Sequence, residues 1–156
     1  MSTTVFLKCQ DKYLFLLRSP HKTVDPNRLN GVGGKLEPGE NYLDAAIRET
    51  QEETGYPVEA SQAVFLGLTQ LKDGYADDWL AAFFLFEVDT FEIPIGNDTR
   101  EGQLMWLPPD EILTSPHELV DDLHNIWPEI IQGRQFFLQA TLNNQEKITQ
   151  YSLTTL

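Results

Sequence analysis

The sequence predicts a single α+β domain over residues 1–156, and three observations support this fold class. A chain of this length can enclose one sizeable core but leaves little room for a second. Hydrophobic residues make up 41% and aromatic residues 11%, which is enough for a packed interior and argues against extensive disorder. Segments with strand-like patterns outnumber helical segments and are mixed with at least two helices.

The first part of the chain predicts a hairpin, a loop and a glycine-rich segment. Residues 3–9 and 12–18 are apolar runs separated by two polar residues, which is typical of two antiparallel strands. Residues 19–30 contain two prolines and several polar side chains, so we expect a loop there. The run GVGGKLEPG at 31–39 predicts a short extended piece that closes in a turn.

A helix is predicted between Asn41 and Gly55. Asn41 is a suitable N-cap, and Asp44 follows three positions later, in the first turn. Gly55 is placed to end the helix, because glycine tolerates the left-handed conformation in which many helices stop.

The middle of the chain predicts strands at 63–71 and 79–88. The second of these, WLAAFFLFEV, is apolar nearly throughout, so we place it centrally in a sheet. Residues 89–100 form a looser stretch with proline and glycine, and 101–107 form another short strand. The sequence PPDE at 108–111 predicts a helix start.

The last part of the chain predicts a second helix and a second hairpin. Residues 117–131 carry the helical pattern, although Pro128 limits its extent. The runs FFLQATL at 136–142 and KITQYSL at 147–153 flank the polar turn NNQE, which indicates a C-terminal hairpin.

The net charge of -13 excludes several classes of partner. Non-specific binding to nucleic acid or to anionic membranes needs a basic surface, so we expect neither. A polyanionic ligand could still bind if divalent cations lay between the two, which would make metal a requirement. No run of about 18 apolar residues occurs, and the first residues lack the pattern of a signal peptide. Cys9 is the only cysteine, which agrees with a reducing cytoplasm, where we expect the protein.

Three glutamates share one face of the predicted helix. Glu49, Glu52 and Glu53 are spaced by three and four residues, which places them side by side. Like charges at this spacing repel by roughly a few tenths of a kcal/mol, and the end of a helix disfavours anions. Arg48 supplies one positive charge, and hard divalent cations such as Mg²⁺ or Mn²⁺ could supply the rest through oxygen ligands.

The spacing around these glutamates resembles the signature motif of the Nudix hydrolase family. Segment 34–56, GKLEPGENYLDAAIRETQEETGY, agrees with that motif at its fixed positions, which are Gly34, Glu40, Arg48, Glu49, Glu52, Glu53 and Gly55. It departs at two positions that are usually apolar, where Thr50 and Tyr56 stand. The resemblance implies the Nudix fold, in which a mixed β-sheet is sandwiched between helices (α/β/α).

By this resemblance, oxygen atoms of the motif hold Mg²⁺, or Mn²⁺ in its place. The implied ligands are four carboxylates and one backbone carbonyl, from Glu49, Glu52, Glu53, Glu101 and Gly33. Arg48 would orient a catalytic glutamate by a charge-assisted hydrogen bond, and Lys35 would contact a phosphate. Gly34, Glu40 and Gly55 would support the structure of the motif.

The implied reaction is hydrolysis of a phosphoanhydride bond in a nucleoside diphosphate derivative. The cation would neutralise the diphosphate and lower the pKa of a water molecule, and a glutamate would take the proton as that water attacks phosphorus. Glu49, Glu52 and Glu101 are all candidates for this base, and the choice among them stays open. The number of metal ions and the oligomeric state stay open as well.

Outside the motif, the chain loosely resembles the branch that hydrolyses oxidised purine nucleoside triphosphates, such as 8-oxo-dGTP, to the monophosphate and pyrophosphate. Asn30 stands where that branch has an asparagine that touches the base, and Asp121 and Asp122 lie about where it has paired aspartates. Trp79, at a strand entrance, is expected to line a cleft in which a base could stack. We therefore expect a small-molecule nucleotide as the partner.

Two other functions remain open. The first is cleavage of ADP-ribose or a nucleotide sugar, which uses the same motif with different substrate-binding loops. The second belongs to another class, a non-catalytic Nudix domain that senses a nucleotide. Such domains typically lose glutamates from the motif, and this sequence keeps all of them.

Overall fold

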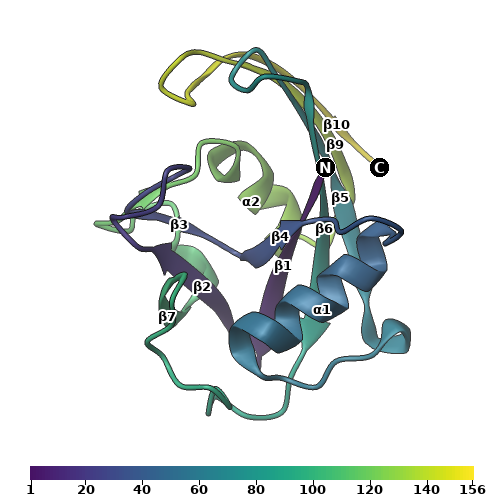
Figure 1. The fold of residues 1–156 in the computed structure, drawn as a ribbon, viewed down its shortest axis with the longest axis vertical. Helices are drawn as coiled ribbons and strands as arrows, with labels where there is room; N and C mark the ends of the chain where they lie inside the picture. The colour runs from purple at the N-terminus through teal and green to yellow at the C-terminus, as the bar shows by residue number, and fades with distance from the viewer.

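The computed structural model describes residues 1–156 as a ten-stranded mixed sheet with two α-helices (Figure 1). The strands are β1 (Ser2–Cys9), β2 (Lys12–Arg18), β3 (Arg28–Asn30), β4 (Val32–Lys35), β5 (Val64–Lys72), β6 (Trp79–Glu87), β7 (Gly102–Leu107), β8 (Glu118–Leu119), β9 (Phe136–Leu142) and β10 (Ile148–Thr155). The helices are α1 (Tyr42–Thr54) and α2 (Leu123–Ile131), and short 3-10 turns lie at Ala60–Gln62 and Pro109–Glu111.

Strand β1 organises the sheet because it pairs with three others. It is parallel to β6 along one edge. Along its other edge, the first half pairs with β4 and the second half with β2, both antiparallel. The sheet continues from β6 through β5, β9 and β10, and from β2 through β3 to β8, while β7 also pairs with β2. Because this edge of β1 pairs first with β4 and then with β2, the sheet splits into two branches here and curls (Figure 1).

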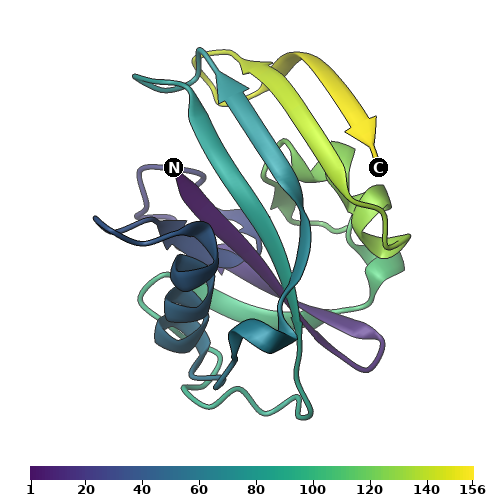
Figure 2. The same cartoon turned by 90° about the vertical axis from the view of Figure 1, so that its right-hand side faces the viewer.

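Alternate residues of β1 face different helices. Val5 and Leu7 belong to the buried cluster that includes the inner face of α1, whereas Phe6 belongs to the cluster under α2. There the fully buried Trp127 presents its ring edge-on to Phe6 and Phe15, at centroid distances of 5.5 and 5.2 Å. The sheet thus lies between the two helices, as Figure 2 shows, and the predicted α/β/α sandwich is confirmed. Neither helix is long and apolar enough to cross a membrane.

Most predicted elements are confirmed, including both terminal hairpins and the helix that follows Asn41. Residues 79–88 form a central strand, as predicted, since β6 lies between β5 and β1. The loop predicted at 19–30 is wrong at its end, where β3 pairs with β2. Residues 117–131 contain the second helix, as predicted, and it starts at Leu123 because the segment before it contains β8, which pairs with β3. The expectation that Pro128 limits this helix is wrong, since Pro128 lies inside α2, which continues to Ile131.

The helix start predicted at 108–111 is confirmed only as a 3-10 turn, which does not continue into an α-helix. The carbonyl of Pro109 accepts the indole N–H of Trp127 at 2.9 Å. This carbonyl is therefore bonded to α2 and does not begin a run of local helical hydrogen bonds. The buried Ile112 follows directly and anchors the turn in the core.

Candidate active site

Helix α1 is held by caps at both ends. The Oδ1 of Asn41 accepts the N–H of Asp44 at 2.9 Å, and Gly55 adopts a φ of 79°, from which its N–H reaches a carbonyl one turn back. On the buried face, the hydroxyls of Thr50 and Thr54 donate to carbonyls four residues earlier, at 2.7 and 2.5 Å. Thr50 therefore occupies a usually apolar position of the motif without leaving an unpaired hydroxyl.

Arg48 connects the turn before the helix to two of the motif glutamates. Its Nε and Nη2 donate to the two oxygens of Glu40 at 2.8 and 2.9 Å, which holds the pKa of Glu40 below its ordinary value. Its Nη1 donates to Glu49 at 2.9 Å and to Glu52 at 3.2 Å. Its Nη2 also donates to the carbonyl of Lys35 at 3.1 Å. One guanidinium thus fixes the direction of three carboxylates.

Two glycines of β4 allow the glutamates of α1 to approach its backbone. The N–H of Gly33 donates to Oε2 of Glu53 at 2.7 Å. Gly33 has a φ of 146°, and a Cβ there would lie only 2.1 Å from the carbonyl oxygen of Thr3. A Cβ on Gly34 would lie 2.4 Å from Oε1 of Glu49. The missing side chain of Gly34 therefore leaves the space that the Glu49 carboxylate occupies, whereas Gly33 allows the close approach of β1.

Burial changes the acidity of the inner glutamates. It raises the pKa of Glu53 to about 8, although the N–H of Gly33 acts in the opposite direction, and the charges of Glu49 and Glu101 add to the rise. Burial also raises the pKa of Glu49. The side chain of Glu52, by contrast, is 59% exposed. These carboxylates need additional positive charge before all of them can be ionised together.

Glu101 precedes β7 and lies close enough to Glu49 and Glu53 to raise their pKa values. Its Oε2 lies 2.7 Å from Nζ of Lys22. No three acidic, histidine or cysteine side chains converge on one point, because Arg48 and Lys22 draw the carboxylates in different directions. The donor set nevertheless fits a hard divalent cation, since it offers only oxygen ligands and an excess of negative charge.

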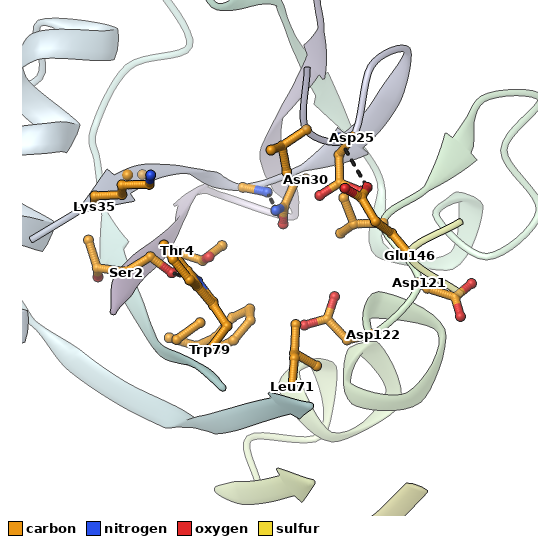
Figure 3. A pocket seen from close by; sticks show the side chains of 18 of the residues that line it. Ser2, Thr4, Asp25, Asn30, Lys35, Leu71, Trp79, Asp121, Asp122 and Glu146 are labelled. Atoms are coloured by element: carbon orange, nitrogen blue, oxygen red, sulfur yellow. Dashed lines mark hydrogen bonds between the residues drawn. The ribbon is translucent and has the colours of Figure 1, made fainter. Parts of the chain in front are cut away.

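A cavity of about 310 Å³ borders the two glycines of β4. Its lining includes all five predicted substrate-binding residues, which are Asn30, Lys35, Trp79, Asp121 and Asp122. Lys35 lies on one side of the cavity and Asp122 on the other, with Asn30 and Trp79 between them (Figure 3). The Nζ of Lys35 is 5.4 Å from the centre of the Trp79 ring. Residues predicted separately from the sequence therefore meet around one space.

The two neighbouring aspartates differ in their contacts. Asp121 Oδ2 accepts the N–H of Ile148 at 2.5 Å, and its Oδ1 lies 3.6 Å from Nζ of Lys147. The carboxylate of Asp122 is contacted only by the backbone N–H groups of Asp122 itself and of Leu123. Burial, together with the charge of Asp25, raises the pKa of Asp122 to about 7. Asp121 thus holds the C-terminal hairpin, while Asp122 is available to a ligand.

Other lining residues were not predicted from the sequence, and three of them are Asp25, Tyr75 and Glu146. The ring of Tyr75 lies 5.7 Å from that of Trp79, so it extends the aromatic wall. All three lie in turns or loops, where no periodic pattern indicates which way a side chain points. The predicted hairpin turn was the one available signal for Glu146, and it suggested only an exposed polar tip.

The sequence and fold are similar to those of known proteins. Residues 2–129 match the model of the NUDIX domain family. The chain is 32% identical over 118 residues to the uncharacterized Nudix hydrolase YvcI of Bacillus subtilis, covering 73% of this chain and 69% of that protein. It is 27% identical over 144 residues to the oxidized purine nucleoside triphosphate hydrolase of Mus musculus, covering 88% and 85%. The structure of the MutT protein from Bacillus halodurans superposes with a TM-score of 0.80 at 21% identity, covering 97% of this chain and 95% of that one, which shows a common fold.

Proposed function

This chain belongs to the Nudix hydrolase family, and from that premise we propose that it hydrolyses a purine nucleoside triphosphate, oxidised forms included, to the monophosphate and pyrophosphate. One observation carries the proposal. The cavity that contains Asn30, Trp79 and Asp122 is also lined by Gly33 and Gly34, the residues against which the motif glutamates pack. The space proposed for the base and the proposed site of hydrolysis are therefore bounded by the same two glycines. We place the enzyme in the cytoplasm, in agreement with its buried and unpaired cysteine.

The proposed cofactor is Mg²⁺ or Mn²⁺, held by carboxylates of Glu49, Glu52, Glu53 and Glu101 and by the carbonyl of Gly33. A divalent cation bound there supplies charge neutralisation for the diphosphate and acidifies water. Lys35, whose exposed side chain lines the cavity beside the glycines, contacts a phosphate oxygen. The chain has a formal net charge of -13, so substrate binding depends on such local positive charge.

Among the candidate bases, we assign proton abstraction to Glu52. Its side chain is 59% exposed and can reach water, and Arg48 orients it at 3.2 Å. Glu49 is 13% exposed and packs against Gly34, which suits a metal ligand better than a proton carrier in contact with solvent. Water then attacks phosphorus as Glu52 takes its proton.

The base is proposed to stack on Trp79 and to be read by polar groups around it. Asn30 Oδ1 already accepts the N–H of Gly31 at 2.8 Å, so its amide nitrogen is the group left to donate to a ligand. Asp122, with a pKa of about 7, can accept a hydrogen bond when ionised and donate one when protonated.

A substrate panel tests this proposal. The purified protein is incubated with Mg²⁺ and canonical or oxidised nucleoside triphosphates, ADP-ribose or nucleotide sugars, and the products are separated by ion-exchange chromatography, with EDTA as control. We expect metal-dependent release of monophosphate and pyrophosphate from a purine triphosphate. A preference for ADP-ribose or a nucleotide sugar would discard the proposed substrate and keep the chemistry. Absence of any metal-dependent cleavage would favour a nucleotide-sensing role.

A further inference from the structure

The tip of the C-terminal hairpin closes the cavity at the end away from Lys35. Glu146, in the turn between β9 and β10, lines the cavity beside Asp25 of the loop before β3. The N–H of Asp25 donates to Oε2 of Glu146 at 3.4 Å, across 121 residues of sequence. Arg28 Nη1 lies 2.8 Å from Oδ1 of Asp25 and 3.7 Å from Oε2 of Glu146. Two carboxylates from distant segments therefore meet at this end.

The two ends of the cavity differ in charge. Lys35 borders one end, next to the glycines of β4, whereas Asp25, Asp122 and Glu146 border the other (Figure 3). Arg28 pairs with Asp25, and Arg18, which also lines the cavity, donates to the carbonyl of Val24 beside Asp25, so these two cations offset part of the charge of the three carboxylates. The cavity therefore matches a ligand with phosphate at one end and hydrogen-bond donors at the other.

The carboxylate of Glu146 is not needed to hold the hairpin turn together. Within the turn, Oδ1 of Asn143 accepts two backbone N–H groups at 2.9 and 3.1 Å. Outside the cavity, Nζ of Lys147 bonds to Glu118. The turn thus keeps its internal contacts without Glu146, whose side chain bonds instead to the loop that contains Asp25 and lines the cavity.

We infer that Asp25 and Glu146 are specificity-determining residues, which select a base whose inner edge carries N–H donors. The inference rests on the proposed function, because it requires a base in this cavity. Carboxylate oxygens accept hydrogen bonds and repel carbonyl oxygens. An amino group of the base can therefore bind here, whereas a carbonyl group at the same place would leave both itself and the carboxylate without a hydrogen bond. A site arranged in this way rejects an analogue that lacks the donor.

The electrostatics of the pair agree with this role. Burial raises the pKa of Glu146, and the neighbouring Asp25 raises it further. The guanidinium of Arg28 acts in the opposite direction. A donor from the ligand would likewise favour the ionised form of the pair, most of all for a ligand that contacts both carboxylates.

Matched nucleotides provide the test. dGTP and dITP differ by one amino group, as do dATP and the triphosphate of purine deoxyriboside. We would compare kcat/KM within each pair for the wild type, Glu146→Ala and Asp25→Asn. In at least one pair, the wild type should prefer the amino-bearing nucleotide by about tenfold or more, because a hydrogen bond to a charged group is lost in the analogue. Glu146→Ala and Asp25→Asn should each remove most of this preference, because they lower kcat/KM for the amino-bearing nucleotide only.

Glu118→Gln is the matched control. It also removes a carboxylate that contacts Arg28 and Lys147, but its side chain does not line the cavity. This variant should keep the wild-type preference. A ratio of two substrates is insensitive to partial loss of folded enzyme, so destabilisation alone cannot mimic the result. Unchanged ratios in the Asp25 and Glu146 variants, or an equal loss of preference in Glu118→Gln, would overturn the inference.

A binding measurement separates this inference from the proposed function. Isothermal titration calorimetry without metal compares GMP with IMP, and AMP with purine riboside monophosphate. If the wild type hydrolyses no triphosphate, the proposed function fails. The inference still stands if the amino group raises affinity in the wild type and not in Glu146→Ala. Equal affinities within both pairs would contradict it.

Discussion

Replacing Gly34 by alanine tests whether the close approach of α1 to β4 sets the catalytic geometry. The new Cβ would lie 2.4 Å from Oε1 of Glu49, whereas ordinary contact begins at 3.4 Å, so the carboxylate must retreat by about 1 Å. The strand cannot yield easily, because β4 is paired with β1 along its length. A shift of about 1 Å near reacting atoms costs roughly 100-fold in rate, and overpacking costs about 1–3 kcal/mol.

The assay combines kcat/KM for the preferred nucleotide with urea unfolding followed by tryptophan fluorescence. Gly39→Ala serves as the control, since no heavy atom lies within 4 Å of a Cβ there. Its φ of 87° should cost alanine about 1–2 kcal/mol of stability, with no loss of rate in the folded enzyme. The control thus separates backbone strain from displacement of the glutamate.

A double-mutant cycle sharpens the test. In a Glu49→Ala background the clash is absent, so Gly34→Ala should no longer reduce the free energy of unfolding. Equal destabilisation in both backgrounds would refute the steric argument. Full turnover by Gly34→Ala alone would refute the link between this contact and catalysis.

Three further predictions concern individual side chains. Glu53→Gln removes a proposed metal ligand at nearly constant volume and should lower Mg²⁺-dependent turnover by more than about tenfold. Full turnover in this variant would contradict the proposal that Glu53 binds the metal. Lys22→Met releases Glu101 from its 2.7 Å ion pair and should tighten Mn²⁺ binding, measured by calorimetry, by up to about fivefold, whereas unchanged affinity would count against Glu101 as a ligand. The pKa of Asp122 is about 7 in the folded protein, above its ordinary value of 3.8, so the folded chain retains a proton that the unfolded chain has lost. Wild-type stability therefore falls between about pH 4 and pH 7 through this group, and Asp122→Asn should gain stability over the wild type across the same pH range in urea unfolding. If the free energies of unfolding of the wild type and Asp122→Asn changed with pH in parallel, Asp122 would have its ordinary pKa in the folded protein.

Local signals explain which parts of the fold could be predicted from the sequence. Helix α1 is specified by neighbouring residues, since Asn41 caps its start and Gly55 its end. The strands β3 and β8 contain three and two residues, too few to show a period. Their pairing, through Arg28 with Glu118, depends on a contact between segments far apart in the chain. No local pattern records such a contact.

The same reasoning applies to the candidate site. The motif gave the glutamates of α1 in advance, because their spacing along one helix determines their common face. The sequence could not distinguish Asp121 from Asp122, since only the position of Ile148 shows that the first is already bonded. Asp25 and Glu146 escaped prediction for a related reason, as their meeting depends on where a loop and a hairpin tip come together in space.

The mixed origin of the cavity has an evolutionary consequence. Its proposed hydrolytic end comes, apart from Glu101, from one continuous stretch, residues 31–53, whereas its opposite end is built from Asp25, Asp122 and Glu146, which are scattered along the chain. Substitutions at one end of the cavity can therefore be inherited without any change at the other end. A duplicated gene could acquire changes in the hairpin tip and accept a new nucleotide, while the stretch that carries out hydrolysis passes unaltered to both descendants.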